Sequence, residues 1–77
     1  MNLYLLSQTE NDGWDTYNSV VVAAESEEIA RHINPSSGGW TEHSGWAKTP
    51  DEVAVQLIGT AAPDIGSGVV LASFNAG

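Results

Sequence analysis

The sequence predicts an α+β fold, in which a four-stranded antiparallel sheet of order β-β-α-β-β carries one helix on one face. Four apolar runs of strand length are bounded by turn residues and polar connections. Between the second and third runs, one segment has helical spacing and begins with a residue that can cap a helix. One helix covers only one face of such a sheet. We therefore expect a single domain over residues 1–77, with the second face of the sheet in contact with another subunit.

The first apolar run, residues 3–6, predicts a strand with apolar side chains on both faces, which indicates either a central strand or a strand with one face buried by a partner chain. Residues 8–16 follow as a polar, locally acidic connection that contains the turn signal Asn-Asp-Gly. The second run, residues 19–24, consists of small and β-branched apolar residues and predicts a buried strand. We expect these two strands to pair antiparallel.

Residues 26–34 predict the helix that follows the second strand. Ser26 can cap its N-terminus by accepting a hydrogen bond from a backbone N–H two or three residues on. Acidic residues follow in the first turn, where the helix dipole favours them. Pro35 disfavours helical geometry at the preceding residue and ends the helix. The face that packs on the sheet is expected to consist of Ile29, Ala30 and Ile33.

Residues 35–50 predict a long aromatic loop. Such loops are uncommon inside compact domains and are often functional. Trp40, His43 and Trp46 follow a flexible Ser/Gly segment at three-residue steps. Two interpretations are open: the indoles close the edge of the core, or they form a stacking surface for a planar ligand or for a partner's side chains.

Residues 51–59 have an apolar pattern that predicts the third strand, and residues 69–74 predict the fourth. Residues 61–68, rich in Pro and Gly, predict the turn between them. A chain of 77 residues buries only roughly 60% of its unfolded surface, so its own core is marginal. Because the strands are apolar on both faces, we expect a homo-oligomer.

Ten acidic residues against two basic ones give a net charge of −8. Such a chain is not expected to bind nucleic acid directly, which requires a basic surface, nor anionic membranes. Solubility is the commoner reason for this acidity. The more specific hypothesis for this acidity is a surface that imitates the phosphates of nucleic acid and binds in a basic groove. The absence of cysteine excludes disulfides, and the absence of a leader or long apolar stretch favours a cytoplasmic location.

No motif predicts an enzyme, and we expect no catalytic residue and no cofactor. Residues 66–68 (Gly-Ser-Gly) lack the Gly-x-Ser-x-Gly spacing of a nucleophile elbow. No phosphate-binding loop or dinucleotide fingerprint is present in the sequence. His32 and His43 could form a metal pair with Glu42, but two histidines without cysteine are a weak signal, and we expect no metal.

Most of the chain resembles a family of very small proteins common in phage and prophage genomes. The resemblance lies in residues 3–8 (LYLLSQ), 13–28 (GWDTYNSVVVAAESEE) and 68–77 (GVVLASFNAG). It covers nearly the whole chain apart from residues 35–50. It implies no particular activity or residue role. It implies a phage context, in which small non-enzymatic proteins are often counter-defence factors.

Within that context, the first predicted function is a sponge: a homo-oligomer that sequesters a nucleotide-derived immune signal without cleaving it. Aromatic side chains would stack on the base. Cationic side chains and loop N–H groups would hold the phosphates. The candidate ligand-binding residues are Trp14, Tyr17, Arg31, His32, Trp40, His43, Trp46 and Lys48.

The alternative function is an acidic inhibitor or nucleic-acid mimic that blocks a basic surface on a host defence complex such as a CRISPR effector. The net charge favours this inhibitor, whereas three tryptophans in so short a chain favour the sponge, which the sequence places slightly ahead. Neutralising Glu10, Asp12 and Asp15 would weaken a mimic but not a sponge. A phage protein with no role in defence is the third interpretation.

Overall fold

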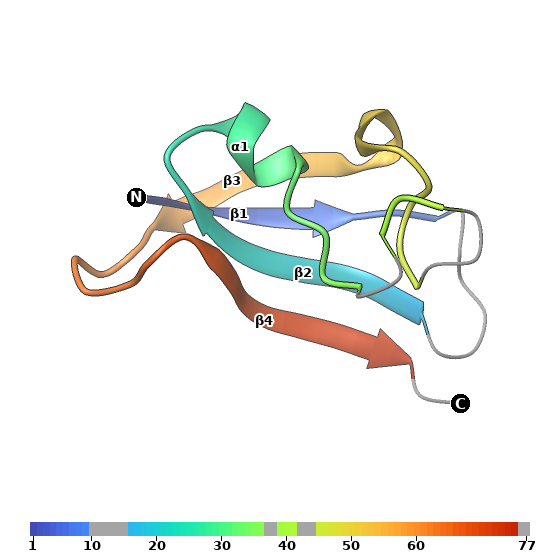
Figure 1. Cartoon of the computed structure of the whole chain (residues 1–77). Helices are drawn as coiled ribbons and strands as arrows, with labels where there is room; N and C mark the ends of the chain where they lie inside the picture. Colours follow the sequence, from blue (N-terminus) through green and yellow to red (C-terminus); the bar gives the residue numbers. More distant parts are fainter. Residues whose placement is uncertain (10–15, 37–38, 42–44, 76–77) are drawn as a thin grey trace.

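A four-stranded antiparallel sheet with one short helix forms the fold (Figure 1). The structure, a computed structural model, describes residues 1–9, 16–36, 39–41 and 45–75. The predicted sheet and helix are confirmed at this level. The elements in chain order are β1 (Asn2–Ser7), β2 (Thr16–Ala24), α1 (Glu27–Arg31), the 3₁₀-helix η1 (Pro50–Glu52), β3 (Ala54–Thr60) and β4 (Gly68–Asn75).

The strand order across the sheet is β3-β1-β2-β4, so the two N-terminal strands are central and the two C-terminal strands are the edges. β1 and β2 pair antiparallel, from Asn2 opposite Ala24 to Ser7 opposite Ser19. This confirms the predicted pairing. The predicted central position of β1 is confirmed, and α1 covers only the face that carries Tyr4 and Leu6.

The core lies on the face of the sheet that α1 covers. Leu6, Val20 and Val22 are fully buried there, because alternate residues of each strand point to this side. Most of the strand side chains in the core are small, so Trp46 fills much of the remaining volume and is itself 0% exposed. The buried cluster consists of Tyr4, Leu6, Val20, Val22, Ala24, Ala30, Trp46, Ala47 and Val53.

A bulge in β2 reorients its first residues. Tyr17 pairs with Phe74 and Ser19 with Ser73, so that Asn18 is the extra residue, and it is exposed. An extra residue breaks the strict alternation of a strand and re-aims a side chain. Tyr17 consequently packs against the core. Its N–H also donates to Gly45 O at 2.7 Å, which attaches the segment before Trp46 to the sheet.

The helix is shorter than the predicted residues 26–34. The predicted cap is confirmed, because Ser26 Oγ accepts a hydrogen bond from the Ile29 N–H at 3.2 Å. After Ala30, which is buried, the chain leaves the helix through bonds three residues apart, including Ile33 N–H to Ala30 O at 3.0 Å. Ile33 packs against the core as expected.

The expectation that Ile29 packs on the sheet is wrong, because 47% of its surface is exposed. A helix of five residues presents little more than one turn to the sheet, and Ala30 occupies the position that faces it. Ile29 precedes Ala30 by about 100° around the helix axis and therefore points away.

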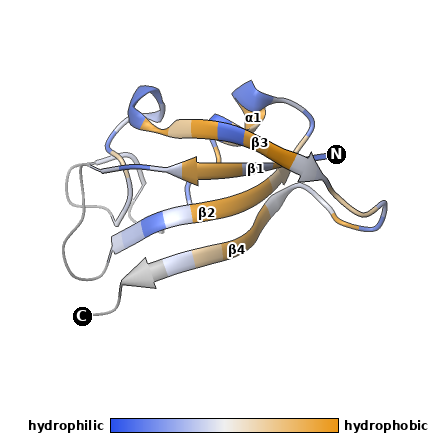
Figure 2. Ribbon diagram, turned by 180° about the vertical axis from the view of Figure 1, so that it is seen from behind, coloured by the Kyte–Doolittle hydropathy of each residue, from blue (hydrophilic) through white to orange (hydrophobic). Residues whose placement is uncertain are grey.

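The helix α1 does not cover the opposite face of the sheet, which Figure 2 shows from the back of the view in Figure 1. By strand alternation, Leu3, Leu5 and Val21 lie on this face, and Leu71 joins them because it pairs with Val21. In Figure 2, apolar colour covers most of β1 and the second half of β2, whose side chains point to both faces. None of the four strands contains a charged residue.

Replacing Trp46 by alanine is expected to lower the free energy of unfolding by about 3–5 kcal/mol, because it removes the largest fully buried side chain. Urea titration followed by circular dichroism measures this loss. Trp40→Ala is the matched control, since Trp40 is only half-buried at the border of the core. Equal losses for the two variants would contradict the assignment of Trp46 to the core.

Candidate functional site

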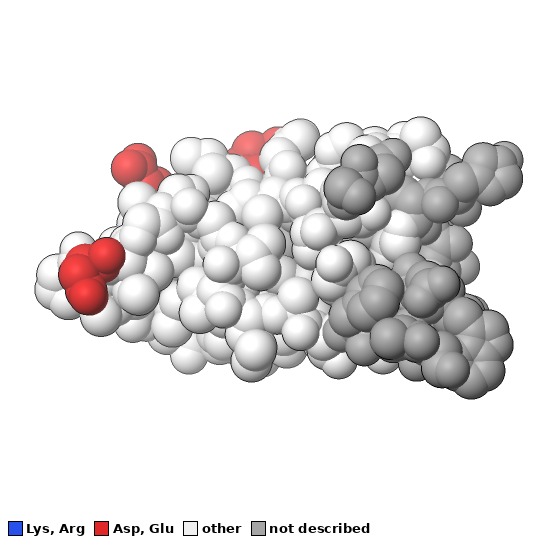
Figure 3. Space-filling view, turned by 60° about the horizontal axis from the view of Figure 1, so that its bottom comes forward, with Lys and Arg blue, Asp and Glu red and all other residues white. Residues whose placement is uncertain are grey.

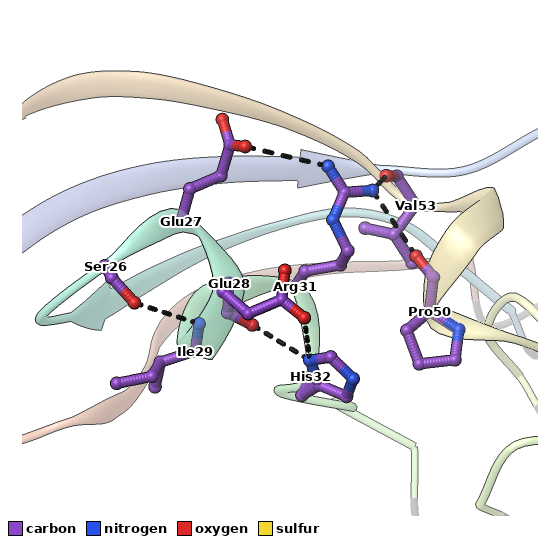
Figure 4. Close-up of polar contacts among 8 residues, drawn as sticks. All are labelled: Ser26, Glu27, Glu28, Ile29, Arg31, His32, Pro50 and Val53. Carbon is purple, nitrogen blue, oxygen red and sulfur yellow. Dashed lines mark hydrogen bonds and ion pairs between the residues drawn. The ribbon is translucent and has the colours of Figure 1, made fainter.

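Arg31 joins α1 to the start of β3 (Figure 4). Its Nη1 donates to Val53 O at 2.6 Å and to Pro50 O at 3.5 Å. Its Nη2 lies 3.9 Å from Glu27 Oε2, and its side chain is 25% exposed. A guanidinium has a planar set of donors, so two carbonyls and a carboxylate fix its orientation. Arg31 therefore has a structural role that holds the helix beside η1 and β3.

His32 lies at the C-terminal cap of α1, where a cation is favourable to the helix dipole. Its Nδ1 lies 2.9 Å from Glu28 O, and because a carbonyl oxygen only accepts, this contact places the proton on Nδ1. Its Nδ1 is also 3.6 Å from Glu28 Oε1. With its side chain 55% exposed, His32 remains at the surface, beside a carboxylate.

Acidic residues lie directly before and on α1 and on η1, and both helices lie above the sheet in Figure 1, α1 over its middle and η1 farther to the right. The Arg31 contacts to Pro50 and Val53 hold these two elements side by side. All acids of this region are exposed, and Arg31 offsets part of their charge: its Nη2 lies near Glu27, while its Nη1 donates to backbone carbonyls. We call this region the helix-side acidic surface, and its members are Glu25, Glu27, Glu28, Asp51 and Glu52.

The β4 side of the molecule differs sharply. Figure 3 brings it forward and shows a broad surface without charge, with acidic side chains only toward its margin and no Lys or Arg in view among the residues drawn as described. Every charged residue of the chain lies outside the four described strands. The described part of the chain thus has an acidic surface and an uncharged surface on different sides.

The predicted ligand-binding residues do not form one exposed group. Trp14 and His43 lie outside the described residues. Tyr17 and Trp40 are half-buried and pack against the core. Lys48 is exposed.

The expectation that Trp46 belongs to a stacking surface needs correction, because its indole is 0% exposed inside the core. Of the two interpretations of the aromatic loop, closure of the core is the one that holds for this residue. The sequence signal that could have revealed it is the small size of the strand residues, which leaves volume for one large side chain. Trp40 keeps part of its surface exposed.

Within residues 1–9, 16–36, 39–41 and 45–75, no pocket is present, and no three His, Asp or Glu side chains come close enough together to hold a metal ion. Among the same residues, no helix has the length and apolar character needed to span a membrane. Comparisons with protein-family models, with characterised proteins and with solved structures find no match to this chain. Its function is therefore inferred from its own residues.

Arg31→Ala is expected to lower the free energy of unfolding by about 1–3 kcal/mol, because two carbonyls lose a charged donor in a partly buried position. Chemical denaturation measures the change. Glu27→Gln is the control that removes only the ion pair. Since Glu27 is 64% exposed, we expect it to cost less than about 0.5 kcal/mol. A larger loss for Glu27→Gln than for Arg31→Ala would show that the carbonyl contacts are not what holds the helix.

Proposed function

We propose that the protein is a non-enzymatic inhibitor that uses the helix-side acidic surface to block a basic surface on a partner protein. The observation that carries this proposal is the separation of charge: exposed carboxylates gather on α1 and η1, while the sheet is uncharged. Arg31 offsets only part of this surface: its Nη2 lies 3.9 Å from Glu27 Oε2, and its Nη1 donates to Val53 O and Pro50 O, so one guanidinium stands against five exposed carboxylates.

A net charge of −8 on 77 residues produces a long-range field that speeds encounter with a basic partner. Basic surfaces of this kind occur where proteins bind nucleic acid, because phosphates demand them. The protein would then compete with nucleic acid for its partner. The resemblance to small phage proteins suggests that the partner is a host defence complex, such as a CRISPR effector, met in the host cytoplasm.

The sponge is the second candidate function, and the order suggested by the sequence is reversed. Two of its main residues have other roles: Trp46 is inside the core, and Arg31 bonds to backbone carbonyls. The partly exposed Trp40 and the exposed Lys48 still favour it. A sponge also needs a cavity for its ligand, and the described residues contain no pocket.

The test compares two triple variants with the same change in charge. Glu27→Gln/Glu28→Gln/Glu52→Gln neutralises the helix-side acidic surface, and Glu10→Gln/Asp12→Asn/Asp15→Asn neutralises the acidic connection after β1. Binding to a purified CRISPR effector without its target DNA is measured by calorimetry at several salt concentrations. We expect the first variant to bind roughly tenfold or more weaker, with a flatter salt dependence, because screened charge pairs are lost.

The second variant is expected to change binding less, since it leaves the helix-side carboxylates intact. Both variants are first checked for an unchanged thermal melt. Loss of binding only in the second variant would mean that the binding surface is the connection after β1. The protein would still be an inhibitor. If the wild-type chain instead binds nucleotides, and Trp40→Ala removes that binding while neither triple variant does, the inhibitor is wrong and the sponge is right.

A further inference from the structure

We propose that β4 pairs edge to edge with β4 of a second copy of this chain, so that two four-stranded sheets join into one continuous sheet. This inference goes beyond the proposed function, because it does not use the helix-side acidic surface. It concerns the opposite side of the molecule, which Figure 3 brings forward.

β4 is an edge strand with little protection. Within the described ranges, no other strand pairs with its outer side. Natural edge strands are usually protected by charged residues, by proline, by bulges or by a covering segment. The eight residues of β4 include no charge and no proline, and the one protective feature among them is a bulge, in which Val70 is the extra residue between the pairs of Leu71 with Val21 and Val69 with Val22. At the other edge, β3 also lacks charge and proline and exposes Leu57 by 59% and Ile58 by 47%, and the Arg31 bond to Val53 O holds only the segment before it.

Three consecutive apolar residues of β4 are exposed: Val69 by 47%, Val70 by 48% and Leu71 by 68%. Leu71 pairs with Val21 and so lies on the uncovered face, whereas Val69 pairs with Val22 and lies on the α1 side. Both faces of β4 are therefore bare at this point. Isolated exposed apolar residues are ordinary, but a contiguous group on an open edge marks an interaction site.

Charge identifies the occupant as a second copy. Two chains of net charge −8 repel, so contact between them costs least through surfaces that carry no charge. β4 is such a surface. In Figure 1 it lies at the bottom of the molecule, whereas α1 and η1 lie at the top. A basic partner would find no counter-charge along this strand. An uncharged apolar strand, in contrast, is complementary to itself.

Symmetry makes this pairing closed. A two-fold axis perpendicular to the sheet gives antiparallel pairing and keeps both uncovered faces on the same side. If the axis passes near the middle of β4, it brings the two Leu71 side chains together, directly opposite or one residue pair apart. The joined sheet then has β3 at both outer edges, and the interface cannot add a third copy.

Sedimentation equilibrium of the full chain tests the proposal, and we expect a dimer with a dissociation constant in the micromolar range. Leu71→Lys should weaken it roughly tenfold or more, because two like charges meet at the axis. Leu57→Lys and Gln56→Lys are matched controls on β3, since Leu57 is 59% exposed and Gln56 is exposed on the uncovered face. Each adds the same charge, and each should leave the dimer unchanged.

A second measurement uses the absence of cysteine in the chain. Leu71→Cys should give a disulfide-linked dimer under mild oxidation, and Leu57→Cys should not.

A chain that stays monomeric at all concentrations, or a dimer whose dissociation constant is unchanged by Leu71→Lys, overturns the proposal. Equal weakening by Leu71→Lys and Gln56→Lys would mean that the uncovered faces stack. Weakening by Leu71→Lys and Leu57→Lys, with growth beyond a dimer, would mean pairing of β3 with β4. Either result also overturns it.

Discussion

The size of α1 is the constraint on which the rest of the structure depends. A helix of five residues is about 7.5 Å long, whereas four strands extend about 14 Å between the outer strand axes. The effect is visible in one row across the sheet, in which Leu57 pairs with Tyr4, Tyr4 with Val22 and Val22 with Val69. The two middle side chains are buried, and the two at the edges are about half exposed. The helix protects the centre of one face, and among the described residues no other α-helix covers the two edges or the other face.

Two features compensate for this small cover. Trp46 fills volume that the small strand residues leave, and Arg31 fixes the helix to the segment before β3 through carbonyl contacts. None of the four strands carries a charged residue, so the carboxylates are confined to the connections and to the short helices. The separation of an acidic surface from an uncharged one is therefore a consequence of how the chain folds. The proposed inhibitor and the proposed dimer each use one of these surfaces.

Local patterns in the sequence predicted the strands, the helix cap at Ser26 and the antiparallel pairing of β1 with β2, because these depend on neighbouring residues. These patterns did not predict the strand order, because the alternation of apolar and polar residues is compatible with several orders. The packing of Tyr17 depends on a bulge, which period-two patterns do not reveal. The roles of Arg31 and Trp46 arise from contacts distant in sequence, so residue type alone suggested ligand binding for both. The aromatic loop was therefore the least predictable part of the candidate site.

Residue-resolved amide hydrogen exchange on the dilute full chain tests most directly the claim that one short helix protects only the centre of the sheet. We expect the slowest amides in β1 and β2 and faster exchange in β4, because β4 is an edge strand. Protection of β4 equal to that of β1 at the lowest concentration would contradict it. Such a result would mean that β4 is covered within a single copy, and neither the one-sided cover nor the open edge would stand.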